Sequence, residues 1–171
     1  MSTETADVGR EDFLNTTPRR ILAGVVGGFV GSLLMGGMMT MMRPGTLNVA
    51  IPAMYGVEGP SAVAGWAFHG WHGVVLGALY VLGVDNVPGL RERARTLGGA
   101  VAGGVGYGVV TTLLPVLVMP LWLSTVGFAN APSFPNLAFP GTVMSAVMHA
   151  VYAVPVALAY YAVGRGTGEA E

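Results

Sequence analysis

The chain has 171 residues, of which 53% are hydrophobic and only 10% are charged, with a formal net charge of −1 and a mean hydropathy of +0.62. Because soluble domains usually carry about 25% charged residues, this composition excludes an ordinary soluble domain and predicts a protein that sits in lipid. The lack of cysteine excludes disulfides, thiolate metal sites and iron–sulfur clusters. The near-zero net charge offers no large basic surface, so no nucleic-acid partner is expected.

Four long uncharged runs follow a polar N-terminal segment with four acidic residues. The runs cover residues 21–42, 61–84, 96–124 and 140–164. At about 1.5 Å per residue, helices of this length cross a hydrocarbon core of about 30 Å. The runs lack the alternation of barrel strands, so they predict an all-α integral membrane four-helix bundle in contact with the lipid bilayer. Pro115 and Pro120 predict a bend near the end of the third run.

The second and fourth runs carry the same pattern eighty residues apart. Residues four apart share one face of a helix, so Gly65, His69, Gly73 and Gly77 form a ridge, and Ser145, His149, Ala153 and Ala157 form its counterpart. Tyr80 and Tyr160 each follow their histidine by eleven positions, and His72 aligns with Tyr152. These matches predict a duplication of a helix hairpin, the two copies being related by an axis along the membrane normal.

The duplication sets the domain organisation. The sequence predicts a flexible cytoplasmic tail at 1–18, one membrane domain at 19–164 and a second cytoplasmic tail at 165–171. Within the membrane domain, the first repeat is 19–84, the linker is 85–95 and the second repeat is 96–164.

Arginine placement predicts the orientation. With four spans, seven of the eight basic residues fall on one side of the membrane, and Arg43 alone falls on the other. Basic residues accumulate on the cytoplasmic side, so we expect a multi-pass protein of the plasma membrane with both termini in the cytoplasm.

Small residues are expected to hold the bundle together. Helices in lipid associate through close backbone approach, and spacings such as Gly24/Gly28 and Gly27/Gly31 permit it. The ridge residues of the second and fourth runs are expected to pack the helices, with Gly73 and Ala153 near one another if the ridges meet directly. The same spacings would also clear a slot for a flat group.

The three histidines all fall in predicted spans, where polar side chains usually face the bundle interior. Helix rise places His69 and His149 at a similar depth, facing each other, with His72 one turn deeper. One hypothesis is that the pair hydrogen-bonds across helices, to each other or to polar neighbours. These neighbours are Tyr107, Thr111, Thr112 and Ser145. A second hypothesis is that the histidines ligate haem or a metal. A third is that they line a path for protons or a small solute.

Ligation takes two forms. Two imidazoles on facing helices, each flanked by small residues, suit axial binding of haem. Alternatively, His69 and His72 share a transition metal with His149, since imidazole suits zinc and copper. Five methionines at the end of the first run, between Met35 and Met42, suit copper(I), although methionine more often fills a core.

Three features of the first half resemble a group of small prokaryotic four-helix integral membrane proteins that has no assigned function. They are a glycine-rich first span, a loop with Pro52-Ala53-Met54, and a second span that opens with Gly65-Trp66 and His69. The resemblance implies a membrane location and a bundle fold, and it implies no activity.

No catalytic motif occurs in the chain: the sequence has no nucleophile elbow, no phosphate-binding loop and no paired carboxylates. We therefore expect a non-enzymatic membrane protein whose histidine pair packs the bundle and is a candidate to bind haem or a metal. The alternative is a small transporter or channel for protons or a small solute that works as an oligomer. A homo-oligomer or a place in a membrane complex is the expected assembly.

Overall fold

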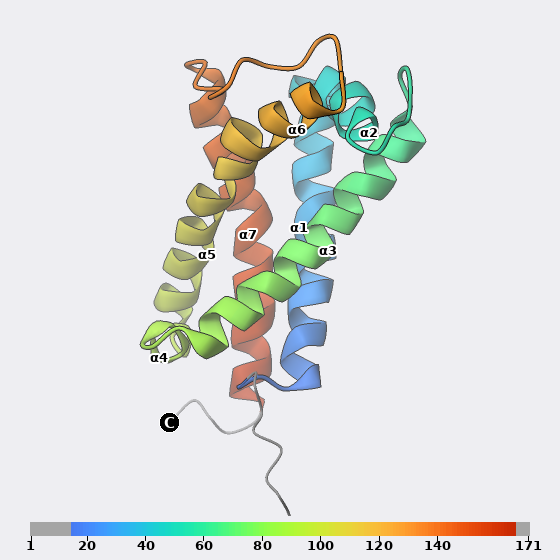
Figure 1. Cartoon of the computed structure of the whole chain (residues 1–171). Helices are drawn as coiled ribbons and strands as arrows, with labels where there is room; N and C mark the ends of the chain where they lie inside the picture. Colours follow the sequence, from blue (N-terminus) through green and yellow to red (C-terminus); the bar gives the residue numbers. More distant parts are fainter. Residues whose placement is uncertain (1–14, 167–171) are drawn as a thin grey trace, which may run out of the picture.

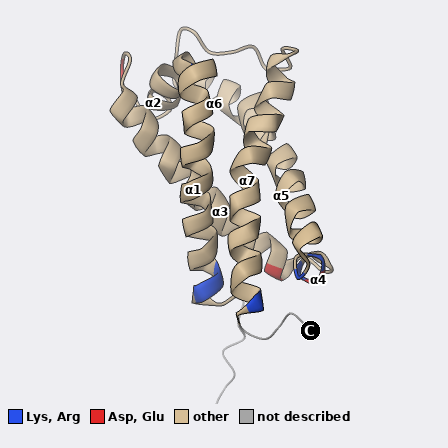
Figure 2. Ribbon diagram, turned by 180° about the vertical axis from the view of Figure 1, so that it is seen from behind, with Lys and Arg blue, Asp and Glu red and all other residues tan. Residues whose placement is uncertain are grey.

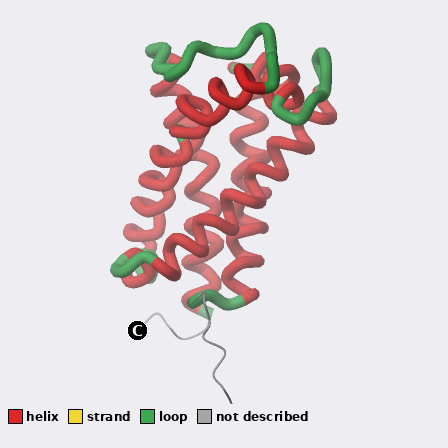
Figure 3. Tube along the Cα trace, in the orientation of Figure 1, coloured by secondary structure: helices red, strands yellow, loops and turns green. Residues whose placement is uncertain are grey.

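The computed structural model of the chain describes residues 15–166, and within them the long elements are all helices (Figures 1 and 3). The long helices are α1 (Pro18–Met42), α3 (Ala62–Asn86), α5 (Leu97–Thr111) with its continuation α6 (Met119–Thr125), and α7 (Gly141–Arg165). Short pieces complete the set: a π-helical segment at Thr46–Ala50, α2 (Ile51–Ala53), α4 (Leu90–Arg93) and a second π-helical segment at Leu114–Val118. The predicted all-α bundle with four helices of membrane-spanning length is confirmed.

Two ends of the bundle are distinct. Arginines gather where α1 begins, where α7 ends and at α4, and we call this the arginine end (Figure 2). The opposite end, built by residues 43–61 and 126–140, is called the loop end (Figure 3). The predicted tails at 1–18 and 165–171 lie largely outside the described residues, although Pro18 and Arg165 belong to helices.

Hydroxyl side chains fix where three of the helices begin. Thr17, Ser61 and Thr96 each accept a hydrogen bond from the backbone N–H three residues on, and thereby cap α1, α3 and α5. Pro18 then suits the first turn of α1, where a missing N–H costs nothing. Two helices extend beyond the uncharged runs: the cap at Thr17 places Arg20 in the first turn of α1, and α3 continues past Asp85.

The prolines bend the third long helix as predicted. After Thr111 the chain passes through the π-helical segment and reaches α6, which leans over the bundle at the loop end (Figure 1). Pro120 has no N–H to donate to the carbonyl of Val116, and the backbone N–H of Asn136 donates to it instead, at 2.9 Å. This bond also ties the loop after α6 to the bend.

Helix α1 packs on both α3 and α7 through two glycine faces. One face meets α3: a Cβ on Gly28 would collide with the Gly73 carbonyl, and a Cβ on Gly77 would collide with the Gly24 carbonyl. The other face meets α7: a Cβ on Gly31 would collide with the Tyr152 carbonyl. The close approach predicted from the glycine spacings is therefore present on both sides of α1.

The two predicted ridges do not pack on each other, so the alternative in which they meet directly is not found. Gly73 and Gly77 of α3 lie against α1, and Gly65 lies against the carbonyl of Leu47. On α7, Ala153 and Ala157 lie against Gly104 of α5. A Cβ on Gly104 would lie 3.1 Å from the Ala153 carbonyl oxygen and 3.1 Å from the Ala157 Cβ. Each ridge thus packs on the preceding long helix. The reason is that glycine on α1 and α5 lets the backbones approach there, whereas α3 runs obliquely across α7 (Figure 1).

Substitution of Gly77 by alanine tests this packing. The added methyl group meets backbone atoms of α1, which cannot rotate away, so we expect the free energy of unfolding to fall by roughly 1–3 kcal/mol. Thermal unfolding in detergent measures the effect. Gly83→Ala is the matched control on the same helix, because a Cβ there meets nothing within 4 Å. Equal stability of the two variants would contradict the packing described.

Candidate functional site

A cavity of about 850 Å³ occupies the loop-end half of the bundle. Its walls come from α1, α3 and α7, from the bend between α5 and α6, and from the loop after α6. All three histidines line it, together with the side chains of Met35, Met39 and Met148. Its size and its mostly apolar wall with a few polar groups are typical of sites for small molecules and cofactors.

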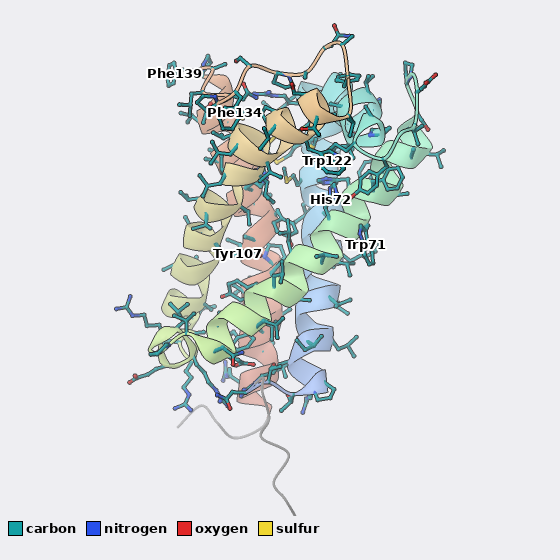
Figure 4. All side chains as sticks on the ribbon, viewed as in Figure 1. Trp71, His72, Tyr107, Trp122, Phe134 and Phe139 are labelled. Carbon is teal, nitrogen blue, oxygen red and sulfur yellow. The ribbon has the colours of Figure 1, made fainter. Side chains whose placement is uncertain are left out.

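The oblique course of α3 creates this cavity. Helix α3 stays against α1 along its glycines but diverges from α5 and α6 toward the loop end (Figure 1). On the arginine-end side of the point where α3 separates from α5, two tyrosines bridge α3 to α5 and α7. The hydroxyl of Tyr107, which is labelled in Figure 4, donates to the Leu76 carbonyl at 2.7 Å. The Tyr152 hydroxyl donates to the Gly73 carbonyl at 2.8 Å. Tyr152 and Leu76 also line the cavity, so this pair of bonds lies along its floor.

His69 is held by α1. Its side chain is 7% exposed, and its Nε2 donates a hydrogen bond to the Ser32 carbonyl oxygen at 3.1 Å. A carbonyl oxygen only accepts, so Nε2 carries the proton and Nδ1 of the neutral ring keeps a lone pair. Gly36 leaves room for the Trp66 ring and for this one, because a Cβ there would lie 2.5 Å from the Trp66 Cζ3 and 3.2 Å from the His69 Cδ2.

His149 is held by its own helix with the opposite nitrogen. Its Nδ1 donates to the Ser145 carbonyl oxygen at 2.7 Å, and the residue is 8% exposed. Nδ1 therefore carries the proton, and Nε2 keeps the lone pair. Of the predicted partners, Ser145 is found, whereas Tyr107, Thr111 and Thr112 bond to backbone carbonyls instead. The two histidines form no hydrogen bond with each other.

The lone-pair nitrogens of both rings touch open space. In the described residues, neither Nδ1 of His69 nor Nε2 of His149 is among the sealed side-chain atoms that lack a hydrogen bond. Both residues line the same cavity. The site thus brings together two imidazoles from α3 and α7, and each has one nitrogen with a lone pair that no described residue bonds.

His72 lies on α3 about one turn after His69, is half-buried, and has a different environment (Figure 4). Its Nε2 is hydrogen-bonded to the hydroxyl of Tyr55, a ring that stacks on Phe68 at 4.0 Å between centroids. Burial raises the pKa of Tyr55, which keeps the hydroxyl protonated and able to donate to His72.

The metal hypothesis with three imidazoles is not supported by the geometry. Within residues 15–166, no group of three or more His, Cys, Asp or Glu side chains is placed to hold a metal ion. The methionine cluster at the end of α1 is also divided. Met35 and Met39 line the cavity, whereas Met41 is 86% exposed.

A second polar cluster, at the arginine end, was missed by the sequence analysis. The Asp85 carboxylate is fully buried, and its Oδ1 lies 3.3 Å from Nη1 of Arg20 and 3.9 Å from Nε of Arg91. The hydroxyl of Tyr160 donates to the same oxygen. The adjacency of Asp85 to an apolar run was visible in the sequence, but only the fold brings it to Arg20, 65 positions away.

Comparisons of the chain with protein-family models, with curated proteins and with solved structures find no match. The resemblance to small prokaryotic four-helix membrane proteins therefore stays a prediction, and the site has to be interpreted from its own chemistry.

Removal of the buried carboxylate is expected to destabilise the bundle strongly. Asp85→Asn removes the negative charge beside Arg20, whose side chain is only 7% exposed, and breaking a buried ion pair typically costs roughly 3–5 kcal/mol. Denaturant unfolding in detergent measures the loss. Glu92→Gln removes an exposed carboxylate at the same end and should change stability by well under 1 kcal/mol. A similar small change for both variants would show that the Asp85 cluster contributes little.

Proposed function

We propose that the chain is a non-enzymatic integral membrane protein that binds a lipid-soluble ligand in the histidine-lined cavity. His69 and His149 are the side chains that hold the ligand, and they also pack the bundle. One observation carries the proposal: each ring is oriented by a backbone carbonyl on one nitrogen, its other nitrogen keeps a lone pair, and both residues line the same cavity. Imidazoles that ligate metals are typically oriented by such a bond from their second nitrogen.

Haem is the ligand that this arrangement suits best. Imidazole is a common ligand of haem iron, and His69 and His149 are the residues that would hold the iron. The bound iron would supply one-electron redox chemistry. Arg43 also lines the cavity, with Nη2 bonded to the Gly141 carbonyl at 2.9 Å, and its guanidinium would attract the carboxylates of the macrocycle.

A single metal ion is the other form of ligation. Met35, Met39 and Met148 bring thioether sulfurs to the wall of the cavity that holds the two imidazoles. Thioether and imidazole together suit copper(I), so copper is the metal favoured by this set of side chains.

An absorption spectrum of the purified protein titrated with haem tests the proposal. We expect a Soret band that is lost in His69→Ala and in His149→Ala and kept in His72→Ala, because His72 is engaged by Tyr55. Circular dichroism verifies that each variant remains helical, and metal analysis of the same preparations detects bound copper. Wild-type protein that takes up neither haem nor metal, or haem binding that survives loss of both histidines, would refute ligation by this pair.

A transporter or channel for protons or a small solute, working as an oligomer, is the second candidate. It is favoured by a series of buried and half-buried tyrosines between the cavity and Asp85. Tyr107 and Tyr80 lie 5.2 Å apart by ring centroids, and Tyr80 and Tyr160 lie 6.2 Å apart. It ranks second because the hydroxyls of Tyr107 and Tyr152 donate to backbone carbonyls and not to one another. Ligand-free protein that dissipates a pH gradient across liposomes would favour it over ligation.

The arginine asymmetry supports a location in the plasma membrane with the arginine end in the cytoplasm. Six arginines of the described residues lie at that end (Arg19, Arg20, Arg91, Arg93, Arg95 and Arg165). Arg43 lies at the other. Both termini are then cytoplasmic. Exposed apolar side chains on the long helices, such as Leu22, Val63 and Val109, would face lipid, a second copy or another subunit of a membrane complex.

A topology reporter tests this orientation. An alkaline phosphatase fused after Arg165 should be inactive and a green fluorescent protein at the same point should fluoresce, because phosphatase folds only outside the cytoplasm. Fusions within residues 126–140 should give the reverse pattern. Active phosphatase after Arg165 would overturn the proposed orientation.

A further inference from the structure

The predicted repeat relates positions eighty apart, and glycine contacts show how the helices correspond. Gly24 of α1 packs against Gly77 of α3, and Gly104 of α5 packs against Ala157 of α7. Both members of the second pair come eighty positions after those of the first. By the same numbering, the contact of α1 with α7 corresponds to that of α5 with α3. These two helix pairs can therefore be compared residue by residue.

Glycine brings the first pair, α1 and α7, into backbone contact. A Cβ on Gly27 of α1 would lie 2.8 Å from the Cα of Val156, so no side chain separates the two backbones there. Gly31, about one turn further on, lies against the backbone carbonyl of Tyr152 in the same way. Close approach of this kind drives helices together in lipid.

The second pair, α5 and α3, has a tyrosine where the first has glycine. Tyr107 comes eighty positions after Gly27, and Leu76 comes eighty positions before Val156. Tyr107 and Leu76 are also in contact, but through a side chain: the Tyr107 hydroxyl donates to the Leu76 carbonyl at 2.7 Å. The Tyr107 ring packs edge-on against Tyr80, with 5.2 Å between the ring centroids. A tyrosine side chain therefore stands between the backbones of α5 and α3.

The cavity begins where this second glycine contact is missing. Thr111 stands at the position that corresponds to Gly31, and its hydroxyl donates to the carbonyl of Gly108 in its own helix. From this level toward the loop end, α3 and the bend after α5 lie on different walls of the cavity. Leu76 lines it from α3, and Leu114 lines it from the bend.

From this comparison we propose that Tyr107 is the positioning residue of the ligand cavity. Its side chain holds α3 away from α5 and thereby sets the space that a ligand can fill. With glycine at this position, α3 would close on α5 as α7 closes on α1. The inference rests on the proposed function in that the space held open is the ligand site, whereas the spacing of the two helices depends on no ligand.

Cross-linking of the full-length protein in liposomes tests the spacing. The chain has no cysteine, so the pair His72→Cys/Thr111→Cys reports only on these two positions, which correspond to Tyr152 and Gly31. A disulfide requires Cα atoms within about 7 Å of each other. We expect little intramolecular disulfide while Tyr107 is present, and a yield at least about fivefold higher when Tyr107→Gly is added.

Two further variants control this experiment. Tyr107→Phe keeps the ring and removes only the hydroxyl bond, so it should leave the yield as low as Tyr107 does. Tyr107→Leu has a shorter side chain and should give an intermediate yield, which keeps the test decisive if the glycine variant does not fold. Circular dichroism verifies the helical content of each variant. Equal yields with all four residues at position 107 would overturn the proposal.

Titration of the single variants with haem tests the consequence for the ligand. We expect Tyr107→Gly to lose at least about tenfold in affinity and Tyr107→Phe to bind as the wild type does. Equal affinity in the wild type and both variants would overturn the role of Tyr107 at the site. Wild-type protein that takes up no haem would refute the proposed ligand instead, and the cross-linking alone would then decide whether Tyr107 sets the spacing.

Discussion

Close backbone contact along α1 is the constraint on which the rest of the structure depends. In lipid, burial of apolar side chains gives little drive for helix association, so packing and hydrogen bonds must supply it. Glycines on two faces of α1 let α3 and α7 approach until carbonyl oxygens lie where a Cβ would stand. Helix α5 then packs on α7 through Gly104 and Gly108. The bundle is thus a chain of close pairs, α3–α1–α7–α5, rather than a closed square.

This open arrangement explains where the polar residues lie. Helix α3 has no close glycine contact with α5, and tyrosine hydroxyls from α5 and α7 reach its carbonyls instead. Beyond those bridges the helices separate, and α6 bends over the gap because Pro115 and Pro120 interrupt the helix that carries it. The cavity and the three histidines occupy that space. At the other end, Asp85, Arg20 and Tyr160 join α3, α1 and α7 through charge and hydrogen bonds.

The sequence was sufficient for the helices but not for their pairing. Hydrophobic length and the positions of Thr17, Ser61 and Thr96 determine the four long helices to within a few residues, and Pro115 and Pro120 determine the bend. The spacing of His69 correctly put its ring inside the bundle. The same spacing could not show that the partner of His69 is the Ser32 carbonyl. Every residue has a backbone carbonyl, so the sequence does not indicate which one accepts the hydrogen bond. The Asp85 cluster and the separation of the two ridges also depend on the oblique angle of α3, which no local pattern specifies.

The carbonyl partners of His69 and His149 have a consequence for the chemistry of any guest. Each ring donates its only N–H to a backbone carbonyl. Both rings can therefore accept a hydrogen bond from a guest in the cavity, but they cannot donate one. A guest with an electrophilic centre, a hydroxyl or an N–H would therefore be bound favourably. A molecule whose polar atoms are all acceptors would meet two repelling lone pairs, and the cavity would discriminate against it without any steric barrier.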